Sequence, residues 1–181
     1  MAIAAVLMIA FIANAAPAFV FETLRLRPLA LSLDGGRRLF GRRVFGSHKT
    51  LGGAILALYA AGIAAENLYS IELRYGIPFG AVDAFGEAWG PAMFRAFALG
   101  VGVVGGDLVG SFVKRRIGLG EGQQGYVLDW GDWIAGALVA AALSGIAFPS
   151  WPVVGGVAFG FLMLQAVCDF AARRLGVRRS Q

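Results

Sequence analysis

Five apolar stretches, each long enough to cross a bilayer as a helix, constrain the fold of this chain more than any other feature. A transmembrane helix needs roughly 20 apolar residues to cross the hydrocarbon core. The alternating pattern of a membrane β-barrel is absent from the sequence, and backbone groups in lipid have to be satisfied within each segment, so we expect helices. The expected spans are residues 1–21, 51–73, 91–113, 132–150 and 151–172.

The composition agrees with a membrane protein and excludes most soluble folds. Hydrophobic residues make up 58% of the chain and charged residues 15%, whereas a soluble domain is nearer to half apolar and a quarter charged. The sequence shows neither an internal repeat nor a separate polar domain. We therefore expect an all-α integral membrane protein whose residues 1–181 form a single transmembrane domain.

The distribution of basic residues predicts the topology. Most of the 16 Lys and Arg residues lie in the loop at residues 22–50, in the loop at residues 114–131 and after residue 172. The positive-inside rule places these segments in the cytoplasm. We therefore expect the N-terminus outside, the C-terminus in the cytoplasm, and a multi-pass protein of the cytoplasmic membrane with two functional cytoplasmic loops.

An acidic residue inside the third expected span requires an explanation, because a carboxylate in lipid is costly. Asp107 lies six residues from the cytoplasmic end of that span, and Ser111, Lys114 and Arg115 follow it at helical spacing on one stripe. One interpretation is a structural ion pair of Asp107 with Arg95 or Arg115. The other is a functional site that opens to the cytoplasm.

A second acidic pair lies at the entrance to the fourth expected span. Asp129 and Asp132 are three residues apart, so a helical turn stacks their carboxylates. Capping and dipole matching would explain one acid in a first helical turn. Two acids beside a glycine-rich loop suit Mg²⁺, which prefers carboxylates and substrate phosphates as ligands.

The loop before the second expected span combines glycines with basic residues. Gly46 allows backbone N–H groups to approach an anion, Lys49 adds charge, and Thr50 precedes a helix N-terminus. Together with Asp34-Gly35 earlier in the loop, these residues predict a polyphosphate cradle. The alternative is a basic loop that only touches anionic lipid.

A glycine stripe accompanies these polar residues on the third span. Gly102, Gly106 and Gly110 recur at steps of four, which favours close packing of two membrane helices. The unusual polarity otherwise gathers at the expected cytoplasmic face, whereas a pore would distribute polar groups across the span. This pattern favours a site where a charged, water-soluble substrate meets a lipid.

The residues around Asp107 resemble a known signature. The segment GDLVGSFVKRRIG at residues 106–118, followed by Asp129 and Asp132, resembles that of the membrane CTP-dependent cytidylyltransferases. The chain length, the five expected spans, and the features at Asp34 and at residues 46–50 are similar to the short archaeal branch of this family, the CDP-archaeol synthases.

The resemblance implies a reaction and its participants. It implies Mg²⁺-dependent transfer of a cytidylyl group from CTP to digeranylgeranyl glyceryl phosphate, an archaeal ether lipid phosphate drawn from the bilayer. The products are the CDP-lipid and pyrophosphate. A second metal or other cation stays open, as does the oligomeric state, and no nucleic acid is expected as a partner.

The resemblance also assigns candidate roles to residues of this chain. The three aspartates would hold the metal, a basic residue would join them in catalysis, and the remaining polar and glycine positions would bind the nucleotide. The metal ligands are Asp107, Asp129 and Asp132; the catalytic set is Asp107, Lys114, Asp129 and Asp132; the nucleotide set is Asp34, Gly46, Lys49, Thr50, Ser111 and Arg115.

Three other functions stay open on the sequence alone. A bacterial-type CDP-diacylglycerol synthase would use the same polar residues, because any apolar groove accepts acyl or isoprenoid tails. A small membrane transporter or channel would need polar residues near mid-membrane on several helices. A non-catalytic membrane subunit would tolerate Asn at Asp107, Asp129 and Asp132.

Overall fold

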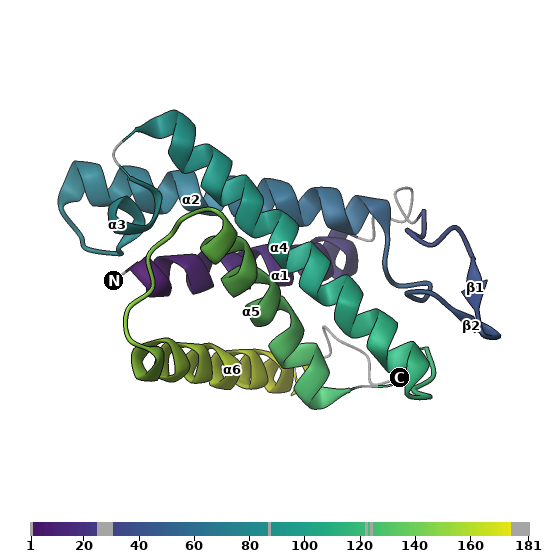
Figure 1. Cartoon of the computed structure of the whole chain (residues 1–181). Helices are drawn as coiled ribbons and strands as arrows, with labels where there is room; N and C mark the ends of the chain where they lie inside the picture. Colours follow the sequence, from purple (N-terminus) through teal and green to yellow (C-terminus); the bar gives the residue numbers. More distant parts are fainter. Residues whose placement is uncertain (1, 25–30, 87, 122, 124, 175–181) are drawn as a thin grey trace.

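The computed structural model describes residues 2–24, 31–86, 88–121, 123 and 125–174. The described part is mostly helical, as expected, with one short antiparallel hairpin in the loop before the second helix (Figure 1). The elements are α1 (Ala2–Leu24), β1 (Arg38–Leu39), β2 (Arg42–Arg43), α2 (Leu51–Tyr75), α3 (Ala81–Phe85), α4 (Trp89–Arg116), α5 (Tyr126–Leu143) and α6 (Trp151–Arg174).

Four helices are long and apolar enough to cross a membrane. Their apolar segments are Ala2–Phe21, Leu51–Tyr75, Trp89–Arg116 and Trp151–Ala172. These helices agree with a multi-pass membrane protein. The count of five spans and the orientation in the membrane stay predictions.

Helix α5 differs from the expected span at residues 132–150. It begins six residues earlier, at Tyr126, and ends at Leu143. Gly145, with φ of 73°, adopts the left-handed conformation just beyond the helix end, which is a common way for a helix to stop. Asp129, which the expected bounds leave in the preceding loop, therefore lies within α5 together with Asp132.

Helices α4 and α5 pack backbone against backbone. A Cβ added at Gly106 would lie 2.1 Å from the carbonyl oxygen of Asp132, and one at Gly102 would lie 2.4 Å from the Cβ of Ala140. On the partner helix, a Cβ at Gly136 would lie 2.1 Å from the carbonyl oxygen of Gly102. The glycine stripe thus has the packing role that its spacing predicts.

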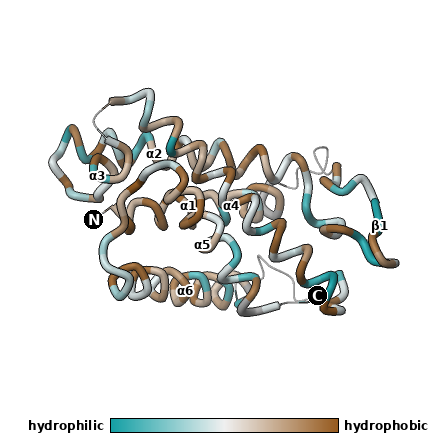
Figure 2. The backbone as a smooth tube through the Cα atoms, viewed as in Figure 1, coloured by the Kyte–Doolittle hydropathy of each residue, from teal (hydrophilic) through white to brown (hydrophobic). Residues whose placement is uncertain are grey.

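Helix α1 forms the centre of the apolar core. Val6, Leu7 and Ile9 are fully buried, and α1 contacts α2, α4, α5 and α6. Trp133 of α5 is also fully buried and meets Phe11 of α1 edge to face, with ring centroids 6.0 Å apart. Hydrophobic residues follow the helix bodies, while hydrophilic ones gather around β1 (Figure 2).

An arginine joins the elements at the opposite end of the molecule from β1 and β2. Arg95 of α4 donates hydrogen bonds from Nε to the carbonyl oxygen of Ser144 at 3.2 Å and from Nη1 to that of Ala84 at 3.4 Å. It therefore satisfies carbonyl groups at the ends of α3 and α5. Arg95 is not the partner of Asp107 that one interpretation of the sequence supposed.

Candidate active site

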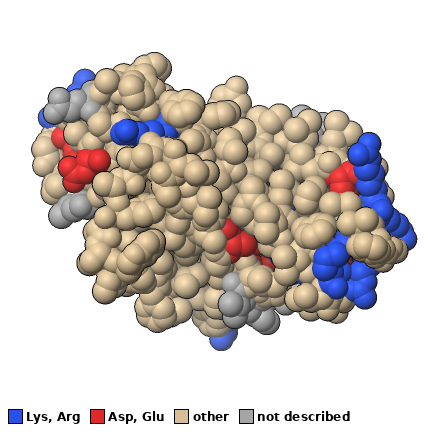
Figure 3. Space-filling view, viewed as in Figure 1, with Lys and Arg blue, Asp and Glu red and all other residues tan. Residues whose placement is uncertain are grey.

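The end of the molecule that carries β1 and β2 also carries its largest group of Lys and Arg side chains (Figure 3). Here the segment 31–50 lies against the last turns of α4. Arg116 donates to the carbonyl oxygens of Leu39 and Arg43, and Arg42 donates to that of Arg115 at 3.0 Å. These contacts hold side by side two of the three segments that supply the predicted site residues; the third is α5.

Asp34 organises the segment 31–50 from within. Its side chain is fully buried, and its two oxygens accept hydrogen bonds from five donors. Burial alone would raise the pKa of Asp34, but the hydrogen bonds from Arg43 and from three backbone N–H groups outweigh it and hold the pKa well below its ordinary value of 3.8. The donors are Ser32 Oγ, Arg43 Nη2 and the N–H groups of Gly36, Phe45 and Gly46.

Asp34→Asn is expected to loosen this segment by about 1–3 kcal/mol, because an amide cannot replace the charged bond to Arg43. The ionised carboxylate stabilises the segment above the ordinary pKa of 3.8, and this contribution falls as the pH drops below that value. Hydrogen exchange at the Gly36 and Gly46 amides should accelerate in the variant. Ser32→Ala, which removes one neutral donor, is the matched control; equal exchange in both variants would contradict this role.

Two other predicted nucleotide residues also shape this segment. Thr50 is the N-cap of α2 and accepts a hydrogen bond from the N–H of Gly53 at 3.1 Å. Gly46 has a φ of 102°, which side chains rarely adopt, and its N–H donates to Asp34. With Asp34, these residues give the loop its shape, and their contact with a nucleotide stays a prediction.

Lys49 joins the loop to α4. Its Nζ lies 2.5 Å and 2.6 Å from the two carboxylate oxygens of Asp107. Asp107 therefore forms an ion pair, as one interpretation of the sequence supposed, but its partner is Lys49 rather than Arg95 or Arg115. Arg115 instead donates from Nη1 to the carbonyl oxygen of Leu119 at 2.9 Å.

A second lysine–aspartate pair joins α4 to α5. Lys114, which is almost fully buried, forms an ion pair with Asp129. The other carboxylate oxygen of Asp129 accepts a hydrogen bond from the N–H of Gly125 at 2.8 Å, which satisfies a donor at the start of α5. The hydrogen bond from Gly125 agrees with the capping role that was one of the two interpretations of Asp129. Asp129 also forms an ion pair with Lys114, which is one of the predicted catalytic residues. Ser111 is buried one turn before Lys114.

Asp132 has the most unusual environment of the three predicted acids. Its Oδ1 accepts a hydrogen bond from the N–H of Trp133, but the buried Oδ2 has no hydrogen-bond partner among the described residues. A Cβ at Gly110 would lie 2.1 Å from this oxygen, so only glycine allows the approach. The charged groups that act on Asp132 are Asp107, Lys114 and Lys49.

The three predicted metal ligands do not form one compact cluster. Within the described residues, no three His, Cys, Asp or Glu side chains are placed to share a metal ion. Asp107 and Asp132 influence each other electrostatically, whereas Asp129 faces Lys114. The two lysines pair with Asp107 and Asp129, and Asp132 carries the carboxylate oxygen that has no partner among the described residues.

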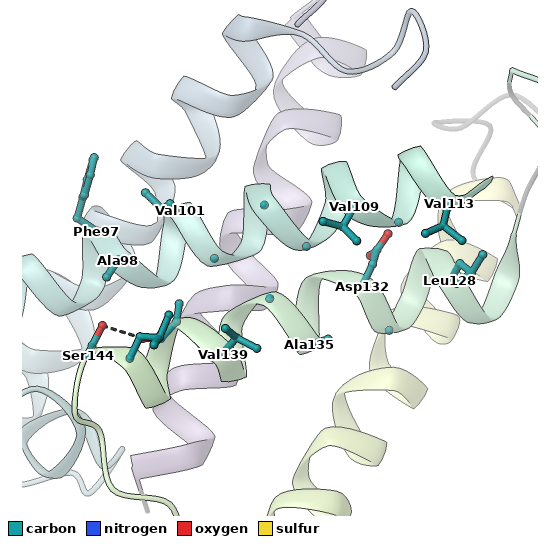
Figure 4. Close-up of a pocket in the computed structure, with 18 of the residues that line it drawn as sticks. Phe97, Ala98, Val101, Val109, Val113, Leu128, Asp132, Ala135, Val139 and Ser144 are labelled. Atoms are coloured by element: carbon teal, nitrogen blue, oxygen red, sulfur yellow. Dashed lines mark hydrogen bonds between the residues drawn. The ribbon is translucent and has the colours of Figure 1, made fainter. Parts of the chain in front are cut away.

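An apolar groove of about 970 Å³ runs along α4 and α5 and reaches this charged cluster. Asp132 is the one charged side chain among the described residues that line it, and Figure 4 shows its carboxylate between the two helices, near Val109 and Val113. The other labelled lining residues are Phe97, Ala98, Val101, Leu128, Ala135, Val139 and Ser144.

The sequence analysis missed one acidic residue that connects the two loops. Glu121 accepts hydrogen bonds from the N–H and the hydroxyl of Ser47, and it lies 3.9 Å from Nε of Arg43. No spacing rule joins positions so far apart in the chain. The only available signal was an acid in the middle of a loop that begins with three basic residues.

Comparisons with known proteins show the family of this chain. The family model described as CarS-like, CDP-archaeol synthase, matches residues 3–154. Curated CDP-archaeol synthases are similar: that of Halobacterium salinarum is 38% identical over 156 residues (81% of this chain and 80% of the relative), and that of Thermofilum pendens is 30% identical over 170 residues (93% and 74%).

A solved structure of similar fold also matches this chain. It is that of an intramembrane enzyme for archaeal membrane lipid biosynthesis, with a TM-score of 0.71 and 26% identity, over 92% of this chain and 91% of that one. The likeness extends over nearly the whole of both chains, and the family model covers most of this sequence. This chain therefore belongs to the CDP-archaeol synthase family of membrane enzymes.

Proposed function

We propose that the protein transfers a cytidylyl group from CTP to digeranylgeranyl glyceryl phosphate at the cytoplasmic face of the cytoplasmic membrane. One observation carries this proposal. The Asp132 carboxylate lines an apolar groove and also lies within the electrostatic reach of Lys49, Asp107 and Lys114. A lipid phosphate needs such a junction, because its tails require an apolar surface and its head group requires charged partners.

The groove is assigned to the isoprenoid tails. Its lining runs along α4 from Phe94 to Val113, which is roughly 28 Å of helix at the usual rise per residue. One leaflet of a bilayer is about 15 Å of hydrocarbon, so the groove is long enough for a tail that stays within one leaflet. Its lining is mostly aliphatic, aromatic and glycine residues, and Asp132 is the one charged side chain among the described residues there.

The reaction joins two anions, so charge neutralisation is its main requirement. A phosphate oxygen of the lipid forms a bond to the α-phosphorus of CTP, while the bond from that phosphorus to the oxygen bridging the α- and β-phosphates breaks. The attacking oxygen is already ionised at neutral pH, so no general base is needed. Lys49 and Lys114 are the cations next to the acids, and both can exchange their carboxylate partners for phosphate oxygens.

The carboxylates fit Mg²⁺ as a cofactor. Asp132 offers a buried oxygen without a hydrogen bond in the described structure, and hard oxygen donors of this kind suit Mg²⁺. Asp107 and Asp132 would hold the ion together with phosphate oxygens of the substrates, and Asp129, which pairs with Lys114 in this structure, would join them once that ion pair opens. When bound, Mg²⁺ would offset the repulsion between the phosphates and align the attacking and leaving oxygens.

Pyrophosphate release by the detergent-purified protein tests this function. We expect release that requires CTP, Mg²⁺ and the ether lipid together, and that is lost with EDTA, with ATP in place of CTP, and in Asp129→Asn. An ester-linked phosphatidic acid arm separates this reaction from that of a CDP-diacylglycerol synthase. Folded, monodisperse protein that releases no pyrophosphate with either lipid would overturn the proposal.

A further inference from the structure

A carboxylate holds the two cytoplasmic loops together at a position surrounded by hydrogen-bond donors. Oε2 of Glu121 accepts hydrogen bonds from Ser47, 3.2 Å from its N–H nitrogen and 2.5 Å from its Oγ. Oε1 lies 3.9 Å from Nε of Arg43, which is close enough for attraction but too far for a hydrogen bond. Glu121 is therefore bound to the loop mainly through one serine.

More donors surround this position than the carboxylate uses. The Nε atoms of Arg43 and Arg115 are both buried, and neither has a hydrogen-bond partner among the described residues. Arg115 as a whole is only 8% exposed. A Cβ built on Gly46 would lie 3.9 Å from Nε of Arg115 and 3.8 Å from Cγ of Glu121, so these groups surround one point.

An orphaned buried guanidinium N–H is costly, and two beside one carboxylate indicate a site shaped for a larger anion. A carboxylate offers two oxygens in a plane, whereas a phosphate group offers three or more around a tetrahedral centre. The hydrogen bonds from Ser47 lower the pKa of Glu121 below its ordinary value of 4.5, so at neutral pH the group in this position is itself an anion.

We propose that Arg43, Ser47 and Arg115 form a phosphate subsite for the nucleotide, and that Glu121 occupies it until a phosphate group takes its place. This inference rests on the proposed function, since it assigns a further part of the same site. A purely structural contact leaves both N–H groups beside Glu121 unpaired, whereas a bound phosphate group would offer them acceptors. Binding of the nucleotide would then release Glu121 from the loop at residues 31–50.

The test is equilibrium binding of radiolabelled CTP, and separately of inorganic tripolyphosphate, to the detergent-purified protein. In Glu121→Gln the competing anion is gone, so we expect about three- to tenfold tighter binding of both ligands. Ser47→Ala removes a donor from the subsite and should weaken both by a similar factor. In the Ser47→Ala background, the gain from Glu121→Gln should shrink, because the two groups share one interaction.

Glu66→Gln is the matched control. Glu66 also accepts a hydrogen bond from a serine hydroxyl, that of Ser70 at 3.0 Å, and another from Nε1 of Trp89, but it lies on α2 far from the loops. Its substitution removes the same charge and should leave both affinities unchanged. If Glu66→Gln tightened binding of both ligands as much as Glu121→Gln does, the cause would be the change in net charge, and the inference would be overturned.

The failures of the inference and of the proposed function are distinguishable. Unchanged or weaker binding in a folded Glu121→Gln variant, alongside wild-type protein that still makes the CDP-lipid, overturns the subsite alone. Wild-type protein that makes no CDP-lipid overturns the proposed function. Glu121→Ala serves as a second variant, and size-exclusion profiles and melting temperatures show whether each protein is folded.

Discussion

Asp132→Asn should lower kcat by roughly 10²–10³-fold, as expected for the loss of one fixed charge from a site that stabilises phosphate chemistry. The substitution keeps the shape of the side chain, so the close approach to Gly110 and the hydrogen bond from Trp133 to Oδ1 can persist. What disappears is the negative charge on an oxygen that the described protein does not pair. We expect this loss to weaken the apparent affinity for Mg²⁺ as well.

The measurement is CDP-lipid formation across a Mg²⁺ titration, with the melting temperature measured in parallel. Asp169→Asn is a control of equal charge: Asp169 lies on α6 and accepts hydrogen bonds from Trp130 and Gln165, whereas Lys49 and Lys114 pair with Asp107 and Asp129. Activity close to wild type in that control, with loss in Asp132→Asn at an unchanged melting temperature, would support the role. Wild-type activity in Asp132→Asn would remove Asp132 from the site.

Gly106→Ala should destabilise the pair of helices that carries the site. The new Cβ would lie 2.1 Å from the carbonyl oxygen of Asp132, and the obstacle is backbone rather than a flexible side chain. Forcing extra atoms into a packed contact typically costs about 1–3 kcal/mol. Because the helices have to move apart at the level of Asp132, we expect a lower melting temperature and a disproportionate loss of activity.

Gly105→Ala is the matched control for this prediction. It adds the same methyl group at the next position of the same helix, where a Cβ would meet no atom of the described residues within 4 Å. Its melting temperature should equal or exceed that of the wild type, since alanine is the better helix former. Equal melting temperatures for Gly105→Ala and Gly106→Ala would refute close α4–α5 packing.

The sequence predicted those features that depend on spacing within one helix. The stripe of Gly102, Gly106 and Gly110 correctly indicated a close helix contact, because residues four apart share a helical face. The family resemblance was confirmed by the match over residues 3–154. The start of α5 was not predicted, because hydropathy locates the apolar part of a helix and Tyr126 precedes two acids.

Partners across the fold could not be read from the sequence. Asp107 had two candidate arginines on its own helix, yet its partner is Lys49, which only the folding of the loop brings near. The contacts of Asp34 within its own loop were not predicted either, and its role toward the nucleotide stays a prediction. In both cases the decisive contacts join segments whose separation carries no periodic signal.

The glycine contact between α4 and α5 also bears on how a lipid would arrive. Two helices in backbone contact cannot separate without losing that contact, so we expect α4 and α5 to move together as one rigid unit. The groove runs lengthwise along these two helices. A substrate diffusing in the plane of the bilayer would therefore dock from the side, and its arrival would be limited by two-dimensional encounter rather than by the opening of a gate.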